Sequence, residues 1–130
     1  METTTVPVST KAKVIGWIIG VIPCLLLLAS SSFKFIQPAG TEEALRTLGL
    51  RIDQLAWLGP LEASVAIIYL IPRTAVLGAI LITGYMGGAI LTHLRVDDFM
   101  IVTHILIGVM VWFGIWLRDP RLRALIPIRT

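Results

Sequence analysis

The segment Pro72–Arg95, PRTAVLGAILITGYMGGAILTHLR, decides the fold class of this chain. Between Arg73 and His93 it contains no charged residue. An apolar run of about 20 residues is long enough to cross the hydrocarbon core of a bilayer as one helix. The sequence therefore predicts a transmembrane helix over residues 75–94.

The rest of the chain repeats this pattern. Of its 130 residues, 56% are hydrophobic and only 15% are charged, whereas soluble domains carry about 25% charged residues. Further apolar runs cover about 14–33, 55–71 and 99–117. Short connections follow the second and third runs, and such connections make successive helices antiparallel neighbours. We therefore expect an all-α fold, a transmembrane four-helix bundle made of two antiparallel hairpins.

The regions outside the membrane domain, 14–117, are interpreted as short flanks. Residues 1–13 are Thr-rich and predict a disordered cytoplasmic tail, and residues 118–130 predict a basic cytoplasmic tail. The start of the first run also has features of a signal peptide, but the run is long for one, so an uncleaved span is expected. In the longest connection, residues 41–50 predict a short helix at the membrane surface.

The distribution of Lys and Arg predicts the orientation. Seven of the 11 lie on the side of the N-terminus and four on the other side. The positive-inside rule then places both termini in the cytoplasm of a multi-pass protein, for which we expect a bacterial plasma membrane. The net charge of +3 lies in these short flanks, so orientation explains it and nucleic-acid binding is not expected.

Glu62 is the most unusual residue of the predicted spans. It lies near the middle of the second run, where an acidic residue costs about 3 kcal/mol on insertion scales and therefore usually faces the bundle interior. Gly59, Ala63 and Ala66 share its helix face and would let another helix approach closely. Two interpretations remain: a structural carboxyl bonded across helices, or a carboxyl that binds a ligand or a proton.

Other polar residues gather in the same half of the predicted membrane. His93 and His104 stand near the ends of two runs joined by a short turn, and Lys34 ends the first run on that side. Topology alone therefore predicts one outward polar cluster of Lys34, Glu62, Thr92, His93, Arg95 and His104.

A haem or a metal ion is not the expected occupant of this cluster. Bis-histidine haem needs imidazoles on opposite faces of the macrocycle. Helices of one hairpin pack only about 8–10 Å apart, so His93 and His104 would more easily meet each other. No His-x3-His or Glu-x-x-His spacing predicts a metal site. Hydrogen-bonded interface histidines, or a site for a small ligand such as a quinone, remain open.

The third run has a glycine pattern on the face of Tyr85. Gly84 and Gly88 form a Gly-x-x-x-Gly pair, which usually indicates close helix contact. Together with Gly59, they are predicted as helix-packing positions. The alternative is that the missing side chains leave a slot beside Tyr85 for a flat or chain-like ligand.

Several segments resemble the DoxX-like family of small bacterial membrane proteins. They are Leu58–Glu62 (LGPLE), Ile71–Thr74 (IPRT), Thr83–Ala89 (TGYMGGA), Thr92–Arg95 (THLR) and Leu117–Leu122 (LRDPRL). The resemblance implies four membrane helices and, from some members of the wider group, a link to quinone-dependent redox systems. It also marks Glu62, Tyr85, His93 and Arg95 as candidate site residues.

Taken together, these patterns predict an accessory membrane subunit more readily than a stand-alone enzyme. We expect a site for a small ligand, with a quinone as the candidate. It would be built from Lys34, Glu62, Tyr85, His93, Arg95 and His104. Expected partners are the lipid bilayer, a membrane or soluble redox protein and further copies of the chain. The alternatives are a small transporter or channel, which a mid-membrane carboxyl would suit, and a purely structural assembly partner.

Overall fold

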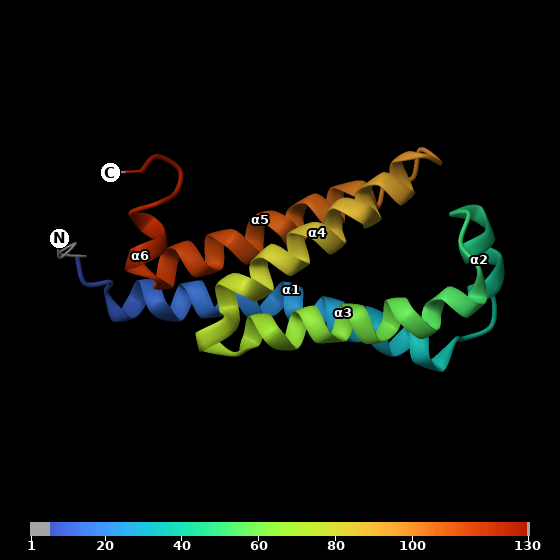
Figure 1. Cartoon of the computed structure of the whole chain (residues 1–130), viewed down its shortest axis with the longest axis horizontal. Helices are drawn as coiled ribbons and strands as arrows, with labels where there is room; N and C mark the ends of the chain where they lie inside the picture. Colours follow the sequence, from blue (N-terminus) through green and yellow to red (C-terminus); the bar gives the residue numbers. More distant parts are fainter. Residues whose placement is uncertain (1–5, 130) are drawn as a thin grey trace.

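A computed structural model describes residues 6–129, in which every regular element is helical (Figure 1). Four long helices carry the fold: α1 (Thr10–Ile36), α3 (Leu55–Leu70), α4 (Ala75–Leu94) and α5 (Ile101–Arg118). Short helices join or follow them: α2 (Thr41–Thr47), η1 (Ile52–Gln54), η2 (Pro72–Thr74) and α6 (Pro120–Arg123). The all-α prediction is confirmed.

Three of these segments are long and apolar enough to cross a membrane: α1, α4 together with η2, and α5. Apolar side chains on their outer faces are more than half exposed, including Ile18, Leu25, Ile80 and Leu106. Exposed apolar area on this scale marks a surface made for a membrane or a partner rather than for water. Helix α3 is equally apolar but has only 16 residues.

Each long helix packs against two others. Helix α1 contacts α3 and α5, and α4 also contacts α3 and α5 (Figure 1). Tyr69 holds the centre of this arrangement: its ring is fully buried, and its hydroxyl donates to the Val111 carbonyl at 2.8 Å. The ring of Tyr69 therefore points inward between the helices. Trp57, at the other end of α3, is 81% exposed.

Both predicted tails are shorter in the structure. The first five residues of the expected N-terminal tail lie outside the described range. Residues 10–13 already belong to α1. The Ser9 hydroxyl accepts from the Ala12 N–H at 3.2 Å and caps the helix there. At the other end, the Arg123 guanidinium donates to the Trp116 and Leu117 carbonyls and holds α6 against the end of α5.

The ends of the helices fall into two groups. The start of α1, the α3–α4 turn and α6 lie at one end of the molecule, and α2 and the α4–α5 turn lie at the other (Figure 1). Towards the second end, the ribbons of α4 and α5 diverge from those of α1 and α3 (Figure 1). The polar residues named in the sequence analysis belong to this second end.

Candidate functional site

A cavity of about 800 Å³ occupies the end where the two helix pairs diverge. Its walls come from α1, α3, α4, the start of α5 and the α2 segment that connects α1 to α3. Apolar side chains form most of the lining, among them Leu26, Phe33, Leu45, Leu48, Leu50, Leu55 and Leu58. Polar side chains reach the cavity from all four long helices: Lys34, Glu62, Tyr85, Thr92, His93 and His104. An apolar cavity with a few convergent polar groups is the usual form of a small-molecule site.

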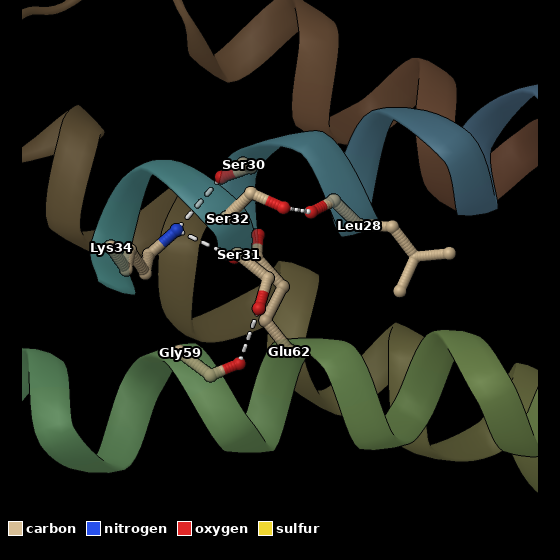
Figure 2. Close-up of polar contacts among 7 residues, drawn as sticks. All are labelled: Leu28, Ser30, Ser31, Ser32, Lys34, Gly59 and Glu62. Carbon is tan, nitrogen blue, oxygen red and sulfur yellow. Dashed lines mark hydrogen bonds and ion pairs between the residues drawn. The ribbon is translucent and has the colours of Figure 1, made fainter. Parts of the chain in front are cut away.

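An ion pair between α1 and α3 forms one polar part of the cavity lining. The Lys34 ammonium donates to Glu62 Oε2 at 2.6 Å and to the Ser30 hydroxyl at 2.8 Å (Figure 2). The Glu62 side chain is only 4% exposed and that of Lys34 is 21% exposed. The buried carboxyl of α3 therefore faces a countercharge rather than lipid.

The small residue one turn before Glu62, Gly59, lies at the contact between α3 and α1. A Cβ atom at Gly59 would stand 3.4 Å from Lys34 Cβ, an ordinary van der Waals distance, so α3 and α1 touch at this position. The Ser31 hydroxyl donates to the Gly59 carbonyl at 2.7 Å and adds a hydrogen bond across the same contact (Figure 2). Helices α1 and α3 are therefore in close contact at Gly59.

The two histidines meet at the rim of the cavity. The ring centroids of His93 and His104 lie 4.7 Å apart with an interplanar angle of 31°. At this spacing the two imidazoles lie against each other, as expected for histidines on one helical hairpin. The two rings do not leave room for a haem between them. Of the described residues, no group of three His, Cys, Asp or Glu side chains could hold a metal ion.

Hydrogen bonds fix which ring nitrogen of each histidine carries a proton. His104 Nδ1 lies 2.7 Å from the Met100 carbonyl oxygen, which can only accept. His93 Nδ1 lies 2.8 Å from Asp98 Oδ2, which also accepts when it is ionised. Each Nδ1 therefore donates, and each Nε2 of the neutral rings is left as an acceptor.

Asp98 is a site residue that the sequence analysis missed. It lies between α4 and α5, and its second oxygen accepts from the Met100 N–H at 3.0 Å. A turn brings it back to His93: Asp97 has a φ of 54°, and the Asp98 N–H donates to the His93 carbonyl at 3.0 Å. The available signal was an acidic residue shortly after a histidine at a helix end, but the reversal of the chain depends on the turn.

The α4–α5 connection is expected to lose stability in acid. The Met100 N–H first, and then His93, hold the pKa of Asp98 below its ordinary value of 3.8. A carboxyl with a lowered folded-state pKa stabilises the fold fully above its unfolded value and loses that contribution as pH falls through the lower folded value. Hydrogen exchange of residues 96–100 should thus accelerate below about pH 4. The Asp98→Asn variant should lack this acid-dependent step; an equal step in both proteins would contradict the assignment.

Gly84 and Gly88 do not lie at a helix contact within the chain. A Cβ atom built at either position would meet no atom of the described chain within 4 Å, and both residues line the cavity beside Tyr85. The prediction of close packing is thus not met here, because α4 diverges from α3 before it reaches these positions. Open space lies beside Tyr85 at these two glycines, which corresponds to the alternative of a slot on this face of α4.

Arg95 is the one predicted site residue that lies outside the cavity lining. Its guanidinium instead lies near Gly49, where a Cβ atom would stand 3.4 Å from Nη2. Two residues beyond His93 correspond to roughly 200° around a helix, so the two side chains leave α4 on different sides. Sequence adjacency was therefore misleading for Arg95.

The fold and the cavity together define a class: a small helical membrane protein with an amphipathic cavity at one end. The family comparison is more specific. The model of the DoxX-like family matches residues 18–117, which is most of the chain, and the protein belongs to that family. No curated protein and no solved structure matches it.

Proposed function

We propose that the chain crosses a bacterial plasma membrane four times, as two antiparallel helical hairpins with both termini in the cytoplasm. Helix α3 would be the fourth span. Its 16 residues give a length of about 24 Å, and the flanking η1 segment extends it towards the hydrocarbon thickness of about 30 Å. The Lys and Arg distribution supports the orientation, since most of these residues belong to the end that holds the start of α1 and α6 (Figure 1).

We further propose that the cavity binds an amphiphilic ligand with a flat polar head and an apolar chain, and that quinones are the ligand class. The observation that carries this proposal is the segregation of the lining: the polar side chains converge from α1, α3, α4 and α5, while Leu and Phe side chains cover most of the remaining wall. The volume of about 800 Å³ lies within the range of small-molecule sites.

The polar groups give the ligand head both donors and acceptors. The Lys34 ammonium can donate to a quinone carbonyl while it keeps its bond to Glu62. The Nε2 atoms of His93 and His104 can accept from the hydroxyl groups of the reduced form. Gly84 and Gly88 would let the ring lie flat against α4 beside Tyr85.

In this proposal the protein is an accessory subunit of a membrane redox system. It would hold the quinone and adjust its protonation, whereas a membrane or soluble partner would exchange the electrons. The exposed apolar faces of α1, α4 and α5 suit lipid and also contact with a partner or with further copies of the chain.

Decyl-substituted benzoquinone should bind the purified protein in lipid nanodiscs and raise its thermal stability. Glu62→Gln should weaken binding about tenfold, because it removes the charge that positions Lys34. Gly88→Leu should abolish binding, since the new side chain would fill the slot beside Tyr85. Binding is measured by quenching of the tryptophan fluorescence and by the shift in Tm.

Gly87→Leu is the matched control for this experiment. Gly87 neighbours Gly88 but does not line the cavity, and a Cβ atom there meets no atom of the described chain within 4 Å. This variant should bind as the wild type does. Absence of binding to the wild type, or equal binding by the Gly88→Leu variant, would contradict the proposed site.

A further inference from the structure

His93 connects the cavity to the outer surface. Its side chain is 16% exposed and lines the cavity, while its partner Asp98 is 36% exposed in the α4–α5 connection. The Nδ1–Oδ2 distance of 2.8 Å joins the two as a hydrogen-bonded pair. One cavity-lining imidazole thus has its Nδ1 bonded to a carboxylate near bulk water, and its Nε2 has no hydrogen-bond partner among the described residues.

Backbone contacts hold this pair in one geometry. The Asp98 N–H donates to the His93 carbonyl at 3.0 Å, and the Met100 N–H donates to Asp98 Oδ1 at 3.0 Å. The carboxylate is therefore oriented from both sides and leaves Oδ2 directed at the ring. A carboxylate that accepts from Nδ1–H fixes the tautomer, raises the basicity of Nε2 and stabilises the imidazolium form.

The neighbouring histidine differs in this respect. His104 Nδ1 donates to the neutral Met100 carbonyl, which stabilises an imidazolium less than a carboxylate does. The other ionisable groups of the lining are the Lys34–Glu62 pair on α1 and α3 and Tyr85 on α4. Because Lys34 and Glu62 neutralise each other, His93 is the base best supported among the groups that line the cavity.

We propose that His93 and Asp98 form a proton-accepting dyad and that the ligand of this cavity carries an acidic hydroxyl group, as phenols and hydroquinones do. This inference rests on the proposed ligand site. The ligand O–H bond breaks and an Nε2–H bond forms on His93. The ring becomes an imidazolium whose Nδ1–H remains bonded to Asp98, and the ligand becomes an oxyanion. Release of the Nδ1 proton through Asp98 to outer water leaves the ring neutral as the Nε2–H tautomer, and loss of that proton with reprotonation of Nδ1 from water restores the acceptor.

A redox-inert probe, 2-decyl-4-nitrophenol, reports this proton transfer directly. Only the phenolate form of the probe absorbs strongly in the visible range, so its absorbance measures the fraction that has lost its proton. Bound to the protein in nanodiscs at a pH below its free pKa, the probe should be largely phenolate. With Asp98→Asn, the phenolate-to-phenol ratio of the bound probe should fall about tenfold, equivalent to one pKa unit. Asparagine can still accept from the Met100 N–H, so the turn is preserved.

The direction of this change separates the dyad from simple charge effects. If Asp98 acted only as a nearby negative charge, its removal would favour the phenolate, and the ratio would rise. His93→Gln, which keeps a polar side chain but cannot take the proton, should lower the ratio as Asp98→Asn does. Asp97→Asn is the matched control and should leave it unchanged, since asparagine also tolerates a positive φ.

The outcomes distinguish this inference from the function on which it rests. No binding of the probe or of the decyl-benzoquinone to the wild type would overturn the ligand site itself. Quinone and probe binding with an unchanged or increased phenolate ratio in the Asp98→Asn variant would overturn the dyad alone. Probe binding that survives Gly88→Leu would place the probe elsewhere and would also overturn the assignment.

Discussion

Glu62→Ala is expected to lower the free energy of unfolding by about 3–5 kcal/mol, the cost of leaving one member of a buried ion pair without its partner. In the wild type the Lys34 ammonium lies 2.6 Å from the carboxylate, and the carboxyl side chain is 4% exposed. Without Glu62, the hydrogen-bond partner left to Lys34 among residues 6–129 is the Ser30 hydroxyl on its own helix. Reversible unfolding in mixed micelles measures the loss.

A second ion pair of the chain provides the control. Glu42 and Arg46 also pair, at 3.1 Å, but their side chains are 60% and 77% exposed. Glu42→Ala should therefore change stability by less than about 1 kcal/mol. The double variant Lys34→Met/Glu62→Leu should recover most of the loss, because no buried charge is left unpaired. An equally large loss in the double variant would show that the carboxyl acts through packing and not through charge.

Gly78→Ala is expected to destabilise the protein by about 1–3 kcal/mol, the usual range for an added methyl group in a packed core. A Cβ atom at Gly78 would collide with the backbone N and Cα of Tyr69 on α3. Backbone atoms cannot move aside as a flexible side chain can. The two helices would have to separate, and the bond from Tyr69 to Val111 would weaken with them. Thermal unfolding, followed by circular dichroism, measures the effect.

Gly84→Ala is the matched control on the same helix. Its Cβ atom would meet nothing within 4 Å in the described part of the chain, so alanine should be neutral or slightly stabilising through its higher helix propensity, worth up to about 1 kcal/mol. If Gly84→Ala proved as damaging as Gly78→Ala, Gly84 would have to lie at a contact with another chain, and the open slot beside Tyr85 would not exist in the assembled protein.

Much of the fold could be predicted because apolar runs and their interruptions are local properties. Helices α4 and α5 begin and end within about two residues of the predicted spans, since polar or Pro-containing segments bound each run. The start of α1 was placed too late, because the Ser9 cap extends the helix beyond its apolar part. Hydropathy reflects which residues contact lipid, whereas a helix cap depends on backbone hydrogen bonds. A hydropathy pattern therefore does not locate the first turn of a capped helix.

The candidate site could be predicted only in part. Lys34, Glu62, Tyr85, His93 and His104 were expected to gather, and all five line the cavity. Their shared depth follows from topology, which the order of the spans already specifies. The position of Arg95 and the contribution of Asp98 were not predictable in this way, because they depend on the rotation of α4 and on the turn at Asp97.

The sequence by itself determined that this is a helical membrane protein of the DoxX-like family, because composition and the motifs of residues 18–117 do not depend on how the helices meet. Only the tertiary structure decided which glycines pack and which leave space. Gly78 and Gly84 share one helix, yet the first lies against Tyr69 and the second borders the cavity. The physical reason is that α4 contacts α3 near their joining turn and then diverges, and no local pattern in the segment Pro72–Arg95 encodes that angle.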